Sequence, residues 1–116
     1  MVKVTLPYPP SVNNYLRFSP RGYAYTTAQA KNYKATAKLQ ALAQGLRPID
    51  GRSIALAIDV YRPQKRGDID NILKVLLDSL NGVAYVDDSQ IVELRIKRND
   101  DKKNPRVEVW VSTPET

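Results

Sequence analysis

Two acidic pairs in the middle of the chain are the residues best suited to chemistry. Asp68 and Asp70 lie in the stretch Arg66–Asn71, and Asp87 and Asp88 follow about one helix length later. Carboxylates that lie close together raise each other's pKa, and a divalent cation removes that cost. Hard oxygen ligands with several retained waters are what Mg²⁺ prefers. The spacing indicates a Mg²⁺ site formed by Asp68 and Asp70 with one further Asp from the Asp87-Asp88 turn.

A helix must position the first of these pairs. Apolar residues recur after residue 68 at the i, i+3 and i+4 spacing of a helix with one buried face, and Asn81-Gly82 supplies a stop signal. We therefore expect a helix that starts between residues 68 and 70. Asp70 and Lys74 would lie one turn apart on its polar side. The apolar residues are Ile69, Ile72, Leu73, Leu76, Leu77 and Leu80.

Structural roles could also account for these acidic residues. Asp68 or Asp70 could cap the helix, and Asp87-Asp88 could be a solvated turn. A cap explains one Asp and leaves the group unexplained. An EF-hand calcium loop does not fit, because Leu73 and Ser79 stand where that loop needs Gly and Glu.

Composition narrows the class of function. The length of 116 residues predicts one domain over residues 1–116, and 18 Lys and Arg against 12 Asp and Glu give a net charge of +6. This balance suits a polyanionic partner. The chain has no Cys and no His, which excludes disulfides, zinc fingers, thiol catalysis and imidazole chemistry. No apolar run is long enough to span a membrane and no signal peptide is recognisable, so we expect a cytoplasmic protein.

Basic and polar residues occur in four places that could contact DNA. They are a proline-rich loop that ends in Asn13-Asn14, an aromatic and basic stretch in residues 15–26, a lysine stripe on a predicted helix, and a basic loop that leads into the acidic cluster. Turn capping, core packing by the tyrosines and an ordinary solvated helix face are the competing explanations. The candidate DNA-binding residues are Asn13, Asn14, Arg17, Arg21, Lys31, Lys34, Lys38, Arg62, Lys65 and Arg66.

The remaining segments predict the fold class. Alternating apolar residues indicate strands near residues 2–7, 54–61, 91–98 and 107–111, and the last two should form an antiparallel hairpin. Residues 15–26 predict a short hairpin or loop. A helix should run from residue 26 or 27 to about 44, with Ala35, Leu39, Leu42 and Leu46 on one side. This order predicts an α+β two-layer sandwich with a mixed, mostly antiparallel sheet and two main helices.

Three motifs in this order resemble those of a known family. They are the stretches Leu6–Asn14, Arg66–Asn71 with Lys74, and Tyr85–Gln90. Together they resemble the RusA family of Holliday junction resolvases of bacteria and their prophages, over residues 2 to about 111. One departure is the segment 81–85, which lacks an aromatic pair of the Phe-Trp kind.

The resemblance implies a small Mg²⁺-dependent endonuclease that acts as a homodimer in DNA recombination and repair. It would nick two opposing strands of a four-way DNA junction. The resemblance also makes Asp68, Asp70 and Asp88 the essential acidic residues and Lys74 the active-site lysine. Two other functions compete with this one: a DNA-binding module without catalysis, and a metal-dependent nuclease specific for another branched DNA.

Overall fold

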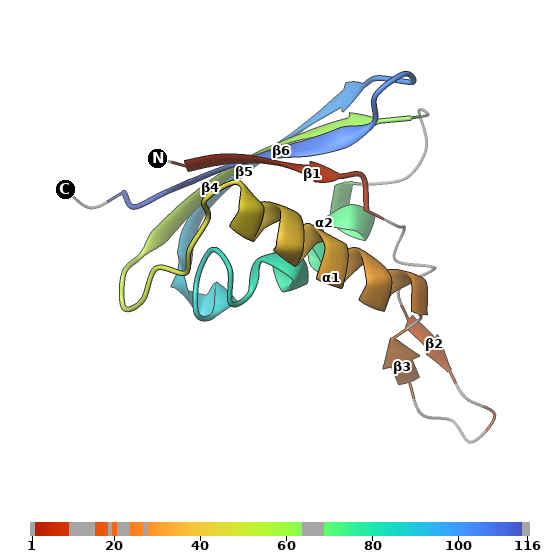
Figure 1. Ribbon diagram of the computed structural model, residues 1–116, viewed down its shortest axis with the longest axis horizontal. Coiled ribbons are helices and arrows are strands. Elements are labelled where there is room, and N and C mark those ends of the chain that lie inside the picture. The colour runs from red at the N-terminus through yellow and green to blue at the C-terminus, as the bar shows by residue number, and fades with distance from the viewer. Residues whose placement is uncertain are drawn as a thin grey trace.

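The computed structural model describes residues 2–9, 16–18, 20, 24–26, 28–63 and 69–114, without the side chains of residues 16–18, 24–26 and 69–71. Figure 1 shows a sheet with both main helices on one face. The fold is α+β, as the sequence predicts. The elements in order are β1 (Val2–Pro7), β2 (Leu16–Phe18), β3 (Ala24–Thr26), α1 (Ala28–Ala43), β4 (Ile54–Arg62), α2 (Ile69–Leu80), the 3₁₀ turn η2 (Asp88–Gln90), β5 (Ile91–Asp100) and β6 (Arg106–Ser112).

The main sheet has the order β1-β6-β4-β5, which corrects one prediction. β5 and β6 do not form a hairpin, because β4 lies between them. β4 pairs with β5 in parallel and with β6 antiparallel, and β6 also pairs antiparallel with β1. Adjacent parallel strands need a crossover connection, and α2 supplies it between β4 and β5. Local alternation predicted each strand correctly but carried no information about its neighbours.

The core lies between the sheet and the two helices. Ile54, Leu56, Ile58 and Val60 point inward from β4, and each is at most 1% exposed. A strand with such a continuous apolar face is most stable at the centre of a sheet, where neighbours and helices cover it. Val4 and Leu6 from β1 and Val107, Val109 and Val111 from β6 complete the buried face.

Helix α1 packs through a face that the sequence analysis did not identify. Leu39 is 69% exposed and Ala35 is exposed, so the predicted apolar side is wrong at these two positions. The buried residues are Ala30, Tyr33, Ala37 and Ala41. Small alanines let the helix approach the sheet closely. The close packing along this face stabilises the fold more than burial of the Leu39 side chain would.

Polar contacts fix α1 against β1. The Tyr33 hydroxyl donates to the Pro7 carbonyl at 2.7 Å. At the other end of the helix, the Gln44 side chain accepts from the Thr5 N–H at 2.7 Å and donates to the Thr5 carbonyl at 2.8 Å. These contacts give hydrogen-bond partners to backbone groups of Thr5 and Pro7 on the outer edge of β1.

The prediction for α2 is confirmed. The helix spans Ile69–Leu80, with Ile72, Val75, Leu76 and Leu80 buried and Lys74 exposed. Gly82 follows at a φ of 83°, a left-handed conformation that favours glycine after a helix end. Ser79 is buried on this helix, and its hydroxyl donates to the Val75 carbonyl.

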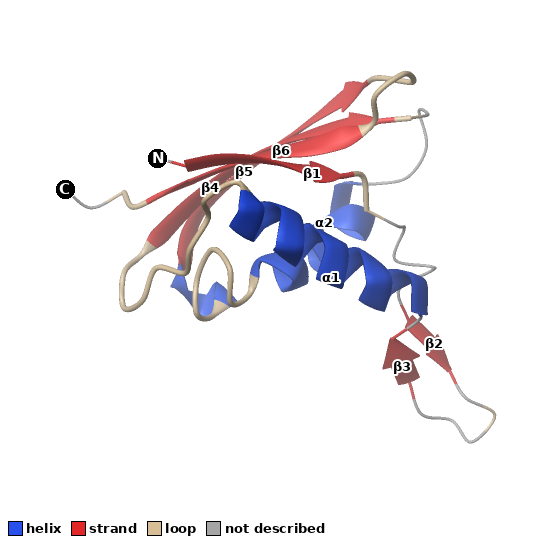
Figure 2. Cartoon of the chain, in the orientation of Figure 1, coloured by secondary structure: helices blue, strands red, loops and turns tan. Residues whose placement is uncertain are grey.

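A small second sheet lies apart from the main one. β2 and β3 pair antiparallel and confirm the predicted hairpin in residues 15–26. Figure 2 shows this hairpin extending beyond the start of α1. Among the described residues, no helix is long and apolar enough to cross a membrane.

The packing of α1 and of the turn that follows it can be tested with two Leu→Ala substitutions, one at a buried position and one at an exposed position. Leu46→Ala should lower the free energy of unfolding by about 3 kcal/mol, because Leu46 is 1% exposed and truncation leaves a cavity. Leu39→Ala should change it by about 0.5 kcal/mol or less, because that side chain is mostly in water. Urea unfolding measures both, and equal effects would contradict this packing.

Candidate functional site

The described residues include part of the predicted acidic site. Asp68, Lys65 and Arg66 lie outside them, as do Asn13, Asn14 and Arg21. Asp70 is the second residue of α2, but its side chain is not described, nor is that of Arg17 in β2. Lys74 lies one turn after Asp70 on the exposed side of the helix, as predicted.

Tyr85 docks the turn after α2 onto the helix. Its ring is fully buried, and its hydroxyl donates to the Leu77 carbonyl at 2.7 Å. The Gly82 N–H donates to the Tyr85 carbonyl at 2.8 Å, so the chain folds back tightly between these residues. This anchor holds the following residues, Asp87 and Asp88, beside the second half of α2.

Burial and three nearby carboxylates both affect the pKa of the Tyr85 hydroxyl. Burial raises this pKa above its ordinary value, and the carboxylates of Asp88, Asp78 and Asp87 raise it further. All three carboxylates are therefore close enough to act on one hydroxyl group. The tyrosine stays protonated and keeps its hydrogen bond to the helix at neutral pH.

The two adjacent aspartates of the turn have different roles. Asp87 is the N-cap of η2, and its carboxylate accepts hydrogen bonds from the backbone N–H and the hydroxyl of Ser89. These two bonds hold the pKa of Asp87 below its usual range. Asp88 is exposed, and no hydrogen bond to its carboxylate occurs within the described part of the chain. Asp88 is thus the member of the pair that is available to a ligand.

Gln90 fixes the position of this turn. Its side-chain oxygen accepts from the N–H groups of Val86 and Asp87 at 2.8 and 3.0 Å. Its amide nitrogen donates to the carbonyls of Ile49 and Arg52, both at 2.8 Å. The sequence analysis did not identify Gln90. The capping-box pattern, Asp at the N-cap with Gln three residues later, is a signal that could have found it.

Two of the predicted site residues, Asp70 and Lys74, lie one turn apart on α2, and residue 78 follows one turn later. Asp78 and Asp88 both act on the pKa of the Tyr85 hydroxyl. His, Cys, Asp and Glu residues form no group of three that could hold a metal ion, within the described ranges that leave out Asp68 and the Asp70 side chain.

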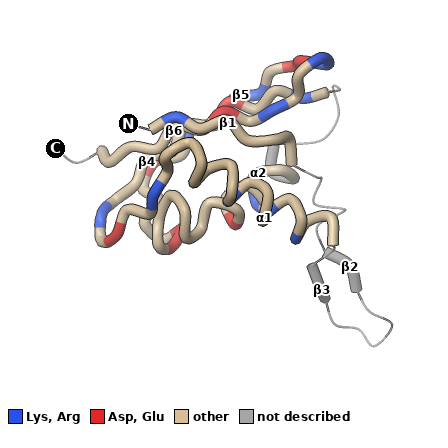
Figure 3. Tube along the Cα trace, in the orientation of Figure 1, with Lys and Arg blue, Asp and Glu red and all other residues tan. Residues whose placement is uncertain are grey.

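The lysine stripe of α1 lies at the molecular surface. Lys31 is exposed, and Lys34 and Lys38 are partly exposed, at the spacing of one helix face. Figure 3 shows the Lys and Arg positions along the chain, including a group at the connection between β5 and β6. Arg62, another candidate for DNA contact, already has a structural partner, because it forms an ion pair with Asp100 at 3.0 Å.

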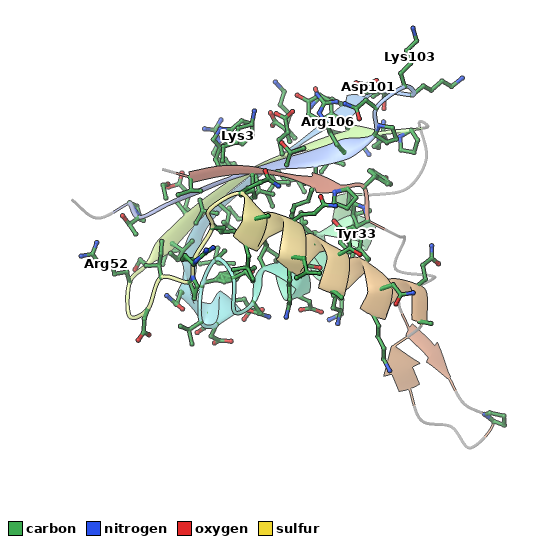
Figure 4. All side chains as sticks on the ribbon, viewed as in Figure 1. Lys3, Tyr33, Arg52, Asp101, Lys103 and Arg106 are labelled. Atoms are coloured by element: carbon green, nitrogen blue, oxygen red, sulfur yellow. The ribbon has the colours of Figure 1, made fainter. Side chains whose placement is uncertain are left out.

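Two basic residues on the outer face of the sheet, Lys3 and Arg106, form ion pairs with acidic residues. Arg106 bonds to Asp101 and to Glu108, each at 2.9 Å. Lys3 lies 3.4 Å from Glu108 and 5.2 Å from the centre of the Trp110 ring. Figure 4 shows Lys3, Asp101 and Arg106 on the side of the sheet away from the helices. Exposed basic residues occur in more than one place: Lys31 and Lys74 lie on the two helices, and Arg95, Lys97, Arg98, Lys102 and Lys103 lie on β5 and the connection that follows it.

Comparison with known proteins gives a consistent result over nearly the whole chain. The family model described as Endodeoxyribonuclease RusA matches residues 7–112. The protein named Crossover junction endodeoxyribonuclease RusA from Escherichia coli (strain K12) is 30% identical over 115 residues, covering 94% of this chain and 92% of that protein. Its namesake from Enterobacteria phage 82 has the same identity and coverage. The uncharacterized protein YqaN of Bacillus subtilis (strain 168) is 42% identical over 52 residues, covering 45% of this chain.

The clamp at Gln90 can be tested by its removal. Gln90→Ala should lower the free energy of unfolding by about 2 kcal/mol, because several backbone groups lose their partner at once. Gln40→Ala is a matched control, because that side chain is exposed on α1. Urea unfolding followed by circular dichroism measures the difference. Equal stability of the two variants would show that the turn does not depend on Gln90.

Proposed function

Because the chain belongs to the RusA endodeoxyribonuclease family, we propose that it is a Mg²⁺-dependent Holliday junction resolvase. It acts as a homodimer that nicks two opposing strands of a four-way DNA junction. The observation that carries this proposal is the similarity to crossover junction endodeoxyribonucleases over 94% of the chain. The exposed carboxylate of Asp88 beside α2 supports it.

The donor groups of the site suit a hard divalent cation. Asp68, Asp70 and Asp88 offer carboxylate oxygens, and the chain has no Cys or His that would favour a softer metal. The division of roles in the turn fits the same ion, because Asp87 is occupied as a cap while Asp88 remains available. We propose that Asp68, Asp70 and Asp88 hold the metal.

The chemistry is phosphodiester hydrolysis. When bound, Mg²⁺ lowers the pKa of a coordinated water and withdraws charge from a phosphoryl oxygen. Lys74 lies on the exposed face of α2 between Asp70 and Asp78, where its ammonium group can stabilise negative charge on the phosphate or assist in removing a proton from the nucleophile. Tyr85 and Gln90 act as positioning residues, because they hold Asp88 against the helix.

DNA is held by charge spread over the helix side of the molecule. Lys31, Lys34 and Lys38 on α1 are candidates for phosphate contacts, together with the basic loop that contains Lys65 and Arg66. The net charge of +6 favours association with a polyanion at low salt. A four-way junction has near two-fold symmetry, so a symmetric dimer presents equivalent sites to two equivalent strands.

The activity is tested with a labelled four-way junction and a linear duplex of matching sequence, each with Mg²⁺ or EDTA. We expect symmetrical nicks in the junction alone, which EDTA abolishes. Asp70→Asn should bind the junction without cutting it, because a neutral amide is a poorer metal ligand. Binding without cleavage in every condition would favour a DNA-binding module. Equal cutting of both substrates would point to a different specificity.

The division of roles between the two adjacent aspartates is tested separately. Asp88→Asn should reduce junction cleavage by about a hundredfold or more, because the site loses a charged ligand. Asp87→Asn should keep activity within about tenfold, because Asn is as good an N-cap as Asp. Initial rates at saturating Mg²⁺ measure both variants. A larger loss in Asp87→Asn than in Asp88→Asn would reverse the assignment.

A further inference from the structure

The edge strand β5 carries an uncovered apolar surface. β5 spans ten residues, Ile91–Asp100, and β4 is its only neighbour among the described strands. Val92 is 63% exposed and Leu94 is 39% exposed, and Ile96 on the same side is partly exposed. Leu94 pairs with Leu56 of β4, whose side chain is buried on the helix side, so the uncovered apolar residues share the face of the core.

A long edge strand with exposed apolar side chains tends to pair with another strand. Its unpaired N–H and C=O groups form a template, and natural proteins usually protect such an edge with bulges, charges or cover. β5 has one bulge, where the partners of Ile54 and Ala55 shift from Ile91 to Glu93. From Glu93 onward the strand is regular, and charged residues alternate with apolar ones as far as Lys97.

Charge and apolar pattern identify the strand that fits this edge. When a strand pairs with its own copy in antiparallel orientation, residues at equal distances from the two-fold axis stand opposite each other. With the axis at Leu94, Glu93 faces Arg95 of the second copy, and this pair occurs twice. Leu94 faces its own equivalent, and Val92 faces Ile96. The pairs between Val92 and Ile96 are then either apolar with apolar or acidic with basic, while Ile91 stands opposite Lys97.

Neighbouring registers lack this complementarity. An axis at Glu93, Arg95 or Lys97 sets a charged residue against its own copy. An axis at Ile96 sets Arg95 opposite Lys97, which are both basic. Like charges directly opposite destabilise a strand pair. An axis between two residues would place apolar side chains of one copy on the polar face of the other.

We propose that β5 pairs antiparallel with β5 of a second copy of this chain, with the two-fold axis at Leu94. The proposal rests on the homodimer of the proposed function and names the surface that forms it. The two four-stranded sheets become one continuous sheet across the axis. Because the axis is perpendicular to the sheet, the helices of both copies lie on the same side of it. Lys74 and Asp88 of both copies then face the same side as well.

A single introduced cysteine tests the register. The chain has no Cys, so Leu94→Cys carries the only thiol. Opposite residues have Cα atoms about 5 Å apart, within the range for a disulfide. We expect mild oxidation to give a covalent dimer on non-reducing gels, which a reductant reverses. Val92→Cys is the control, because two Val92 residues would be about 14 Å apart and should not crosslink.

Sedimentation of the native protein distinguishes an error in the proposed interface from an error in the proposed homodimer. A native dimer in which Leu94→Cys does not crosslink would place the interface elsewhere and overturn this proposal, while the homodimer of the proposed function would stand. A native protein that stays monomeric at all working concentrations would overturn the homodimer and this surface together. Equal crosslinking of the two cysteine variants would contradict the register.

A charge exchange tests the Glu93–Arg95 pair. Glu93→Arg and Arg95→Glu should each raise the dimer dissociation constant about tenfold, because each creates two like-charged pairs across the axis. The double variant exchanges the charges and should restore the native value to within about threefold. A double variant as weak as the single variants would contradict the pairing.

Discussion

The parallel pairing of β4 with β5 is the constraint on which the rest of the structure depends. β4 has the most continuous apolar face and takes the centre of the sheet, between β5 and β6. A parallel neighbour requires a crossover, so α2 must leave the end of β4 and return the chain to the start of β5. This single choice carries Asp70 to the first turn of α2. It also places Asp87 and Asp88 in the turn that closes the crossover.

The turn before β5 shows how structural and chemical roles are separated in a short segment. Asp87, Ser89 and Gln90 form hydrogen bonds with one another and with neighbouring backbone groups. The hydroxyl of Tyr85 attaches the segment to α2. These contacts leave Asp88 exposed on a well-supported backbone. A metal ligand gains from such support, because its position is set before the ion binds and less ordering remains to be done. The two adjacent aspartates therefore differ in their hydrogen bonds, because only the carboxylate of Asp87 is bonded within the turn.

The charged residues at the surface also differ between the two sides of the sheet. On the outer face of the sheet, Arg106 and Lys3 are paired with acidic residues, and the edge at β5 combines exposed apolar side chains with alternating charge. The helix side carries the lysines of α1 and the exposed Lys74. Exposed basic residues therefore occur both on the helix side and along β5 with the connection that follows it.

The sequence by itself determined the elements, the α+β class and the family, because these depend on local periodicity, stop signals and motifs in order. α2, β4 and the exposed position of Lys74 all follow from such patterns. Tertiary structure alone decided that β4 separates β5 from β6 and that α1 buries small alanines instead of Leu39. These choices depend on which surfaces compete for the same neighbours, and that competition has no local signature in the sequence.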